Sequence, residues 1–323
     1  MAPRHTRFGV VLGAGGVLGA AWSAGALAAL QPRLPRPADE ADLIVGTSAG
    51  SVLAAALRCG VGVDEVVAHQ RGAHLVVLPH LSSLDGEAGG LPPLPRIRIG
   101  SPELLARTAR APHRVRPWVA ASALVLQGRG QLRSLGLMIE AMLALSGQRA
   151  DWPRRNTWIM AVDYGSGRRV AFGRAGAPAA SLADAVVASC SIPGWYQPKD
   201  IDGQRYIDGG VRSSTSLDLL ARADLDEVFV LAPMASYALD SPRHPAVRLE
   251  RVFRRIITIA LTREVRKVEA SGKRVTVLTP GPADLAVMGA NLMNAGRREA
   301  VLETSLRTSA AALEDAPAPR AAA

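Results

Sequence analysis

The chain has little cysteine, little lysine and few aromatic residues, and each shortage excludes a class of protein. Cys59 and Cys190 are the only cysteines among 323 residues, so the sequence contains neither a disulfide framework nor a Cys-x-x-Cys pair for zinc. Lys199, Lys267 and Lys273 are the only lysines, and the net charge of +10 is carried mainly by arginine. Aromatic residues make up 4% of the chain, which predicts an aliphatic core packed closely through alanine. We expect no metal and no cofactor.

Only one long uncharged run is present, and it imitates a signal peptide or a membrane span. It extends from Phe8 to Leu30 and follows Arg4 and Arg7. Six glycines interrupt the run and disfavour a continuous apolar helix. We therefore predict a strand, a loop and a helix inside the folded domain, in a soluble cytoplasmic protein or one bound peripherally to a membrane.

Apolar segments typical of buried strands alternate with helical stretches along most of the chain. The candidate strands are 8–12, 43–46, 157–163, 169–172, 228–232 and 274–279. The candidate helices include 20–30, 51–57, 64–70, 135–145, 246–270 and 297–312. This alternation predicts an α/β layer fold with a largely parallel sheet. We expect one domain over residues 1–314, with a mainly helical cap or lid at 75–150, and a disordered tail at 315–323.

The segment Gly46-Thr47-Ser48-Ala49-Gly50 follows the apolar run Leu43-Ile44-Val45 directly. A strand that leads through Gly-x-Ser-x-Gly into a helix is typical of a nucleophile elbow, where the serine stands on a tight turn. The helix after the serine points its N-terminus at the site and favours negative charge there. The same five residues also fit an ordinary Gly/Ser turn, so the motif needs context.

A glycine-rich loop, Gly13-Ala14-Gly15-Gly16-Val17-Leu18-Gly19, follows the first candidate strand. Backbone N–H groups in such a loop hold an anion, either a phosphate or the oxyanion of an acyl-transfer intermediate. The dinucleotide fingerprint Gly-x-Gly-x-x-Gly fails here, because its third glycine falls on Leu18 when counted from Gly13. Asp39 nevertheless lies at a suitable distance for a ribose carboxylate, so a nucleotide-binding alternative stays open.

A third motif, Asp208-Gly209-Gly210, ends a strand-like segment that includes Tyr206 and Ile207. Two glycines after the aspartate let its backbone approach another loop closely. Taken alone, the motif is also a common Asp-Gly turn.

The three motifs together, in this order, resemble the patatin-like phospholipase family. The segments Ala188-Ser189-Cys190-Ser191-Ile192-Pro193-Gly194 and Trp158 to Phe172 are similar to family segments as well. The likeness covers roughly residues 8 to 235 and is weak over 75–150. Two positions depart from the family pattern: Leu18 stands where an arginine or lysine is usual, and Ala14 replaces a glycine.

The resemblance implies a three-layer α/β/α fold and a serine acyl hydrolase without a catalytic histidine. Ser48 would be the nucleophile and Asp208 its base, and the N–H groups of Gly15, Gly16 and Val17 would form the oxyanion hole. The motif glycines Gly13, Gly19, Gly46, Gly50, Gly209 and Gly210 would support these residues. The implied substrate is a lipid carboxylic ester, of the kind that a phospholipase A or a lysophospholipase cleaves.

Three alternatives to this mechanism remain at the level of sequence. A Ser-His-Asp triad would need one of the six histidines, none of which has a distinctive setting. These are His5, His69, His74, His80, His113 and His244. The chain could instead bind a nucleotide or phosphate through its glycine loop, or be a catalytically silent member of the family that docks on membranes.

Two segments bear on membrane binding. Between Arg96 and Arg133 there are eight arginines and one acid, Glu103, around Trp118 and an apolar run. This composition suits an anionic membrane or a solvated face, whereas nucleic acid is not expected because aromatic residues for base stacking are missing. The helix expected at 246–270 has apolar residues at Val252, Phe253, Ile256 and Ile259. We expect these four to face the core, with membrane binding as the alternative.

Overall fold

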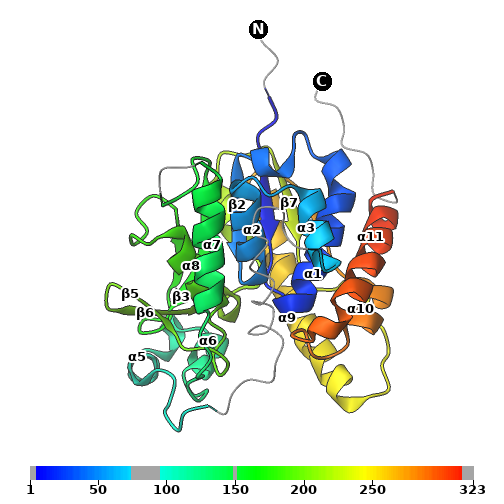
Figure 1. Cartoon of the computed structure of the whole chain (residues 1–323). Coiled ribbons are helices and arrows are strands. Elements are labelled where there is room, and N and C mark those ends of the chain that lie inside the picture. The colour runs from blue at the N-terminus through cyan, green and yellow to red at the C-terminus, as the bar shows by residue number, and fades with distance from the viewer. Residues whose placement is uncertain (1–4, 74–94, 148–150, 315–323) are drawn as a thin grey trace.

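The computed structural model describes residues 5–73, 95–147 and 151–314, which form a central sheet between two layers of helices (Figure 1). The strands are β1 (Phe8–Leu12), β2 (Leu43–Thr47), β3 (Thr157–Asp163), β4 (Arg169–Phe172), β5 (Lys199–Ile201), β6 (Gln204–Asp208), β7 (Glu227–Leu231) and β8 (Arg274–Leu278). The sheet runs in the order β5-β6-β3-β2-β1-β7-β8, with β4 paired to β3. Strands β3, β2, β1, β7 and β8 are parallel, and β4, β5 and β6 pair in antiparallel fashion.

The described helices pack in three groups, of which the two larger ones lie on opposite faces of the sheet. They are α1 (Gly16–Leu30), α2 (Ala49–Arg58), α3 (Val63–Gln70), α5 (Pro102–Arg110), α6 (Pro117–Ser122), α7 (Arg133–Leu145), α8 (Leu182–Cys190), α9 (Pro245–Glu269), α10 (Pro282–Met288) and α11 (Arg298–Glu314). The first core cluster contains residues of α1, α2, α3, α7, α8, α10 and α11, and the second contains residues of α9 and the short 3-10 helix Leu217–Arg222. A third, smaller cluster joins α5 and α6 to β3 and β6. The predicted three-layer α/β/α arrangement is therefore confirmed.

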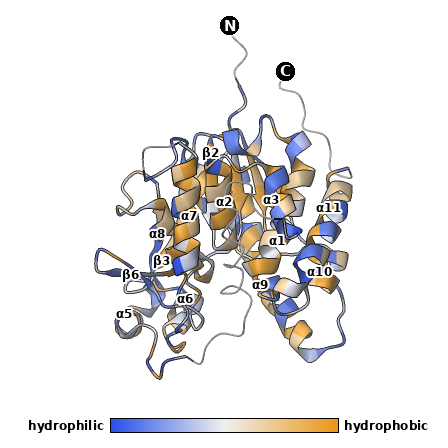
Figure 2. Cartoon of the chain, in the orientation of Figure 1, coloured by the Kyte–Doolittle hydropathy of each residue, from blue (hydrophilic) through white to orange (hydrophobic). Residues whose placement is uncertain are grey.

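The buried strands are apolar on both sides, as a parallel sheet between two helical layers requires. Along β1, Val10 and Leu12 belong to the first core cluster, whereas Val11 belongs to the second. Figure 2 shows mostly hydrophobic residues in α1, α2 and α7, which lie over the first face. The run from Phe8 to Leu30 thus forms β1, a loop and α1 within the domain, as predicted.

The register of β3 brings the ends of β2 and β6 together. Thr47 at the end of β2 pairs with Met160, and Asp208 at the end of β6 pairs with the next residue, Ala161. Strand β4 pairs with β3 over residues that overlap both of these segments. Each edge of a strand accepts one partner at a time, so β2 and β6 lie end to end along the edge opposite β4. Residues far apart in sequence therefore meet at one point.

Several expected boundaries shift. Helix α1 begins at Gly16 rather than Ala20, because the glycine loop itself supplies the first turn of the helix. Strand β6 covers the strand-like segment expected before Asp208, whereas β5 was not expected; β5 has only three residues, two of them charged. Of the segment 75–150, the structure describes 95–147, which holds α5, α6 and α7. Its role as a cap stays a prediction, and the tail expected at 315–323 lies outside the described residues. None of the described helices is long and apolar enough to cross a membrane.

Candidate active site

Ser48 stands on a sharp turn between β2 and α2. Its backbone has φ 52° and ψ −125°, a conformation that a residue with a Cβ adopts only when its surroundings impose it. Its N–H donates to Ser189 Oγ at 2.8 Å, and the Ser189 hydroxyl donates to the carbonyl of Met160 at 2.7 Å. These two bonds fasten the turn to β3, so the serine is held at the carboxyl edge of the parallel strands.

Glycines flank Ser48 because backbone from neighbouring segments occupies the space of a side chain. A Cβ on Gly50 would lie 2.0 Å from the carbonyl oxygen of Leu12, and one on Gly46 would lie 2.6 Å from the carbonyl oxygen of Gly50. The start of α2 is thus pressed against the end of β1, where the glycine loop begins.

Asp208 is buried beside Ser48. The N–H of Gly210 donates to its Oδ1 at 2.7 Å, and the Ser48 side chain is the other polar group that favours its charged form. Burial raises the pKa of Asp208 to about 6, while Ser48 and the Gly210 N–H favour the charged form and limit the rise. Gly209 is required here as well, since its Cβ would lie 2.4 Å from the carbonyl oxygen of Met160.

The glycine loop lies against both of the other motifs. A Cβ on Gly210 would lie 3.2 Å from the Cβ of Ala14, so the loop touches the segment after Asp208. Gly16 has φ +60°, and its Cβ would lie 2.9 Å from the sulfur of Met293. Ala14 therefore fits where the family has glycine, whereas Gly16 occupies a position that needs glycine.

The loop leaves three consecutive N–H groups for a ligand. Four others donate to backbone carbonyls: Gly13 to Leu231, Ala14 to Ser214, Leu18 to Leu292 and Gly19 to Gly15. Within the described parts of the chain, no acceptor is bonded to the N–H groups of Gly15, Gly16 and Val17. These are the three predicted oxyanion donors, at the N-terminus of α1. The side chain of Leu18 is buried in the core and so does not affect the charge of the site.

An apolar cavity of about 250 Å³ opens onto Ser48. Gly16 and Val17 line it together with the serine, so two of the three N–H donors face the same space. Most of the remaining wall is aliphatic or methionine, contributed by α2 and α7 among others. It includes Val52, Leu53, Val66, Leu135, Met138, Met142 and Ile192.

Cys190 also lines this cavity, but its thiol is a poor nucleophile there. Burial raises the pKa of the Cys190 thiol to about 12, and the nearby Asp208 carboxylate adds to the rise. The reactive form of cysteine is the thiolate, which is therefore scarce at neutral pH. The nucleophile that the geometry offers is the serine hydroxyl.

A Ser-His-Asp triad would need a histidine near Ser48, and one of the described histidines lines the same cavity. His69 lines the cavity, whereas His244 caps the N-terminus of α9. His5, which precedes β1, and His113, which lies beside α5, are exposed. His74 and His80 fall outside the described residues. Asp208 adjoins Ser48, because the ends of β6 and β2 meet along the same edge of β3.

The ribose role considered for Asp39 is contradicted. Asp39 lies in the 3-10 helix Ala38–Glu40, which precedes β2, whereas the glycine loop follows β1. Because β1 and β2 are parallel, the two positions lie at opposite edges of the sheet. Asp39 instead presents its backbone carbonyl to the buried guanidinium of Arg58.

Comparison of the sequence with models of known families identifies the family of this chain. Residues 10–76 and 101–221, more than half of the chain, match the model described as Patatin-like phospholipase. The chain belongs to the patatin-like phospholipase family. Membership assigns this patatin-like chain to the lipid ester hydrolases, and the matched residues include Ser48 and Asp208. No curated protein matches the sequence.

Solved structures with a similar arrangement share little sequence with this patatin-like chain. VipD from Legionella pneumophila is 13% identical with a TM-score of 0.44, and 96% of this chain and 67% of VipD are covered. The type III effector ExoU is 16% identical with a TM-score of 0.35, covering 97% and 53%. Human GIVD cytosolic phospholipase A2, solved with methyl gamma-linolenyl fluorophosphonate, is 12% identical with a TM-score of 0.37, covering 96% and 58%. The chain thus spans about half to two thirds of these proteins.

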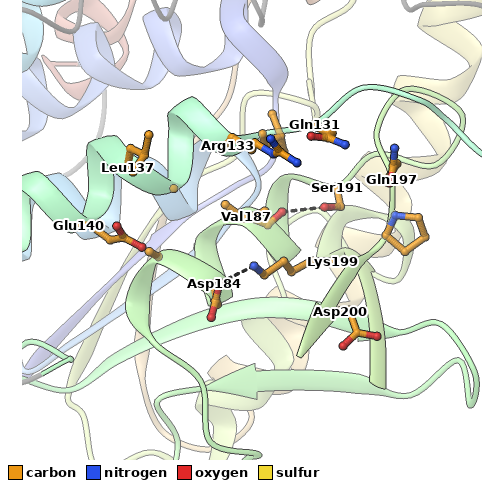
Figure 3. A pocket seen from close by; sticks show the side chains of 14 residues that line it. Gln131, Arg133, Leu137, Glu140, Asp184, Val187, Ser191, Gln197, Lys199 and Asp200 are labelled. Atoms are coloured by element: carbon orange, nitrogen blue, oxygen red, sulfur yellow. Dashed lines mark hydrogen bonds and ion pairs between the residues drawn. The ribbon is translucent and has the colours of Figure 1, made fainter. Parts of the chain in front are cut away.

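A second and larger cavity of this patatin-like domain, about 480 Å³, lies on the other side of α7 (Figure 3). Leu132 borders both cavities, while Arg133 and Glu140 of α7 face only the second. There Lys199 forms an ion pair with Asp184 at 2.5 Å. Its wall contains charged side chains, and Ser48 is not part of it, so size alone does not identify the site of chemistry.

The sequence did not predict the roles of two residues that support the patatin-like site, Ser189 and Glu264. Ser189 was noted only as part of a family-like segment, yet it holds the Ser48 turn. Glu264 of α9 is buried, and its carboxylate accepts from the Ser213 and Thr215 hydroxyls at 2.6 and 2.8 Å. The intervening Ser214 carbonyl accepts the Ala14 N–H at 2.8 Å. Glu264 therefore positions the segment after Gly210 against the glycine loop. In the sequence, the role of Glu264 is indicated only by an acidic residue on the inward face of a predicted helix.

Proposed function

We propose that the chain hydrolyses carboxylic esters of lipids through Ser48 and Asp208. The proposal rests on the position of Ser48, at the wall of an apolar cavity and beside the buried carboxyl group of Asp208. A serine hydroxyl is a weak nucleophile and needs an adjacent proton acceptor. Burial makes Asp208 a stronger base than an exposed aspartate, because it raises the pKa to about 6.

The reaction follows as two acyl transfers. Asp208 takes the proton of Ser48 as its oxygen attacks the ester carbonyl, and the N–H groups of Gly15, Gly16 and Val17 hydrogen-bond the resulting oxyanion. Collapse breaks the bond to the leaving alcohol, which receives the proton from Asp208. Water, deprotonated by Asp208, then attacks the acyl-serine. The bond to Ser48 Oγ breaks, Asp208 returns the proton to that oxygen, and the fatty acid is released. Loss of one oxyanion donor typically costs about 10²–10³ in rate.

The cavity favours an acyl chain as the group bound next to Ser48. Ligand pockets for drug-sized molecules measure roughly 300–1,000 Å³, so about 250 Å³ accommodates part of one acyl chain rather than a whole phospholipid. The glycerol and headgroup of a phospholipase A or lysophospholipase substrate would then remain at the mouth of the cavity.

The basic segment from Arg96 to Arg133 supports peripheral contact with an anionic membrane. All eight of its arginines are exposed, and so are Trp118 and Ile97, with exposed fractions of 56% and 100%. Exposed apolar side chains among arginines suit the headgroup region of an anionic bilayer.

A fluorophosphonate probe tests the nucleophile directly. We expect covalent labelling of the native chain and none of Ser48→Ala, together with hydrolysis of a short-chain ester by the native chain only. Asp208→Asn should lose most activity, and His69→Ala should keep it.

The alternatives predict other outcomes. Labelling lost in His69→Ala but kept in Asp208→Asn would replace the dyad with a triad. Folded protein that is neither labelled nor active, yet is stabilised against heat by a nucleotide, would indicate the binding function. Inactivity with neither effect would indicate a silent family member.

A further inference from the structure

The solvent-facing side of α9 carries the apolar residues that were expected to face the core. Val252, Phe253, Ile256 and Ile259, the residues predicted to face inward, are exposed, so that interpretation is wrong. With Leu249, which is 72% exposed, they form a stripe of five large apolar side chains at helical spacing. We name these five residues the outer face of α9. Exposed apolar patches of this kind mark interaction sites.

The inner side of the same turns is charged, which reverses the usual amphipathic pattern. Arg251 is buried and bonds to Asp240 and to the carbonyl of Leu285, the latter at 2.8 Å. Arg254 is buried too, and its guanidinium donates to Glu250 Oε1 at 2.7 Å. A surface helix normally buries its apolar stripe and exposes its charges. Polar bonds therefore hold this half of α9 in place while its apolar stripe stays outside.

The charges around the outer face have one sign. From Pro245 to Lys267, each exposed charged residue is basic, namely Arg248, Arg255, Arg263, Arg266 and Lys267. The acids of this stretch, Glu250 and Glu264, are turned inward and bonded. Apolar residues between cations complement an anionic bilayer, whereas a second copy of this face would oppose cation to cation.

The outer face lies at the edge of the sheet that carries the active site. Arg254 of α9 donates to the carbonyl of Pro233 at 2.6 Å, and a Cβ on Gly15 would lie 2.8 Å from the Pro233 ring. The first half of α9 thus adjoins the glycine loop through one residue. Figure 1 shows this half of α9 and the helices α5 and α6 at the same end of the molecule, below the sheet.

We propose that the outer face of α9 is a membrane-binding surface that inserts its apolar side chains between the headgroups of an anionic bilayer. Arg248 and Arg255 border the stripe and pair with lipid phosphates. The basic segment 96–133 contacts the same bilayer from the opposite side of the active site. The mouth of the cavity is then held at the lipid surface, and binding needs no hydrolysis.

Vesicle flotation of the Ser48→Ala chain tests the surface without digesting the lipid. The vesicles are phosphatidylcholine alone or with about 30% phosphatidylglycerol. We expect binding to the anionic vesicles, reduced more than about tenfold by the double variant Val252→Asp/Ile256→Asp, and about fivefold by Arg255→Glu. Leu145→Asp, a matched change at an exposed apolar residue on α7, should bind normally.

The outcomes distinguish membrane binding by the outer face of α9 from self-association, and both from the proposed hydrolysis. Circular dichroism and an unchanged Tm establish that each variant is folded, as expected for exposed positions. Equal binding by the folded double variant, or equal loss in Leu145→Asp, overturns the proposal. A change from dimer to monomer in light scattering, with vesicle binding intact, assigns the face to a second copy instead. Absence of hydrolysis by the native chain affects only the Ser48–Asp208 mechanism.

Discussion

At the scale of single residues, the site depends on a carboxyl group placed in an unfavourable environment. Asp208 loses the hydration of its charged form and regains a hydrogen bond from the Gly210 N–H and a favourable interaction with Ser48. The group therefore holds its proton more tightly than an exposed aspartate, with its pKa raised to about 6. The same change makes its ionised form a better acceptor for the serine proton.

The pH dependence of hydrolysis should show this carboxyl directly. Because the base must be ionised, kcat/KM for a short-chain ester should fall about tenfold per pH unit below an apparent pKa of about 6. The measurement is a pH–rate profile of the native chain, with His69→Ala as the control that keeps the limb. A limb near the ordinary aspartate pKa would contradict burial as the cause.

The backbone of Ser48 predicts a difference between two inactive variants. Glycine adopts positive φ readily, whereas alanine keeps the steric cost that serine bears at φ 52°. Ser48→Gly should therefore be more stable to urea than Ser48→Ala by about 1–2 kcal/mol. Both lack the hydroxyl, so equal free energies of unfolding would show that the turn is not strained.

At the scale of elements, the site depends on how closely α2 approaches the end of β1. The ideal Cβ of Gly50 lies within 2.0–2.8 Å of three backbone atoms of Leu12 and Gly13, which cannot yield as a side chain can. Separation of these two elements would displace the glycine loop from the serine.

Gly50→Ala should consequently destabilise the chain by about 3 kcal/mol or more and abolish probe labelling. Gly62→Ala is the matched control, because Gly62 begins α3 with φ −67° and its Cβ meets only a Glu65 oxygen at 3.9 Å. It should cost less than about 1 kcal/mol. Similar losses from both changes would contradict the close approach as the reason for glycine.

Elements with a strong local pattern were predictable from the sequence. The apolar runs of β1, β2 and β3 and the strand–turn–helix motif at Ser48 appear where expected, because burial on both sides of a parallel sheet leaves a continuous apolar signal. The edge strand β5 lacked that signal. The orientation of α9 was predicted wrongly, because the apolar spacing of its outer face matches that of a core helix. Buried contacts of Arg251 and Arg254 instead turn the opposite side of α9 inward.

At the scale of the whole molecule, two groups of exposed basic residues lie near the active-site edge. The net charge of +10 includes the exposed arginines of segment 96–133 and those beside the outer face of α9. Such a field attracts anionic surfaces over about one Debye length, which is roughly 10 Å at 0.1 M salt and 3 Å at 1 M.

Salt should therefore separate two activities of the same chain. Hydrolysis of lipid in anionic vesicles should fall by about tenfold or more between low and high salt, because the attraction is screened. Hydrolysis of a short-chain ester should change little, since the buried dyad is shielded from ions. Parallel losses on both substrates would contradict a charge-driven approach to the membrane.

The meeting of β2 and β6 along one edge of β3 has a consequence for folding. Ser48 and Asp208 become neighbours only when Thr47 has paired with Met160 and Asp208 with Ala161. Pairings between such distant segments form slowly compared with local helices. The rate at which a fluorophosphonate captures Ser48 during refolding would then act as a clock for completion of the sheet, and helical circular dichroism should reach its final value before the serine becomes reactive.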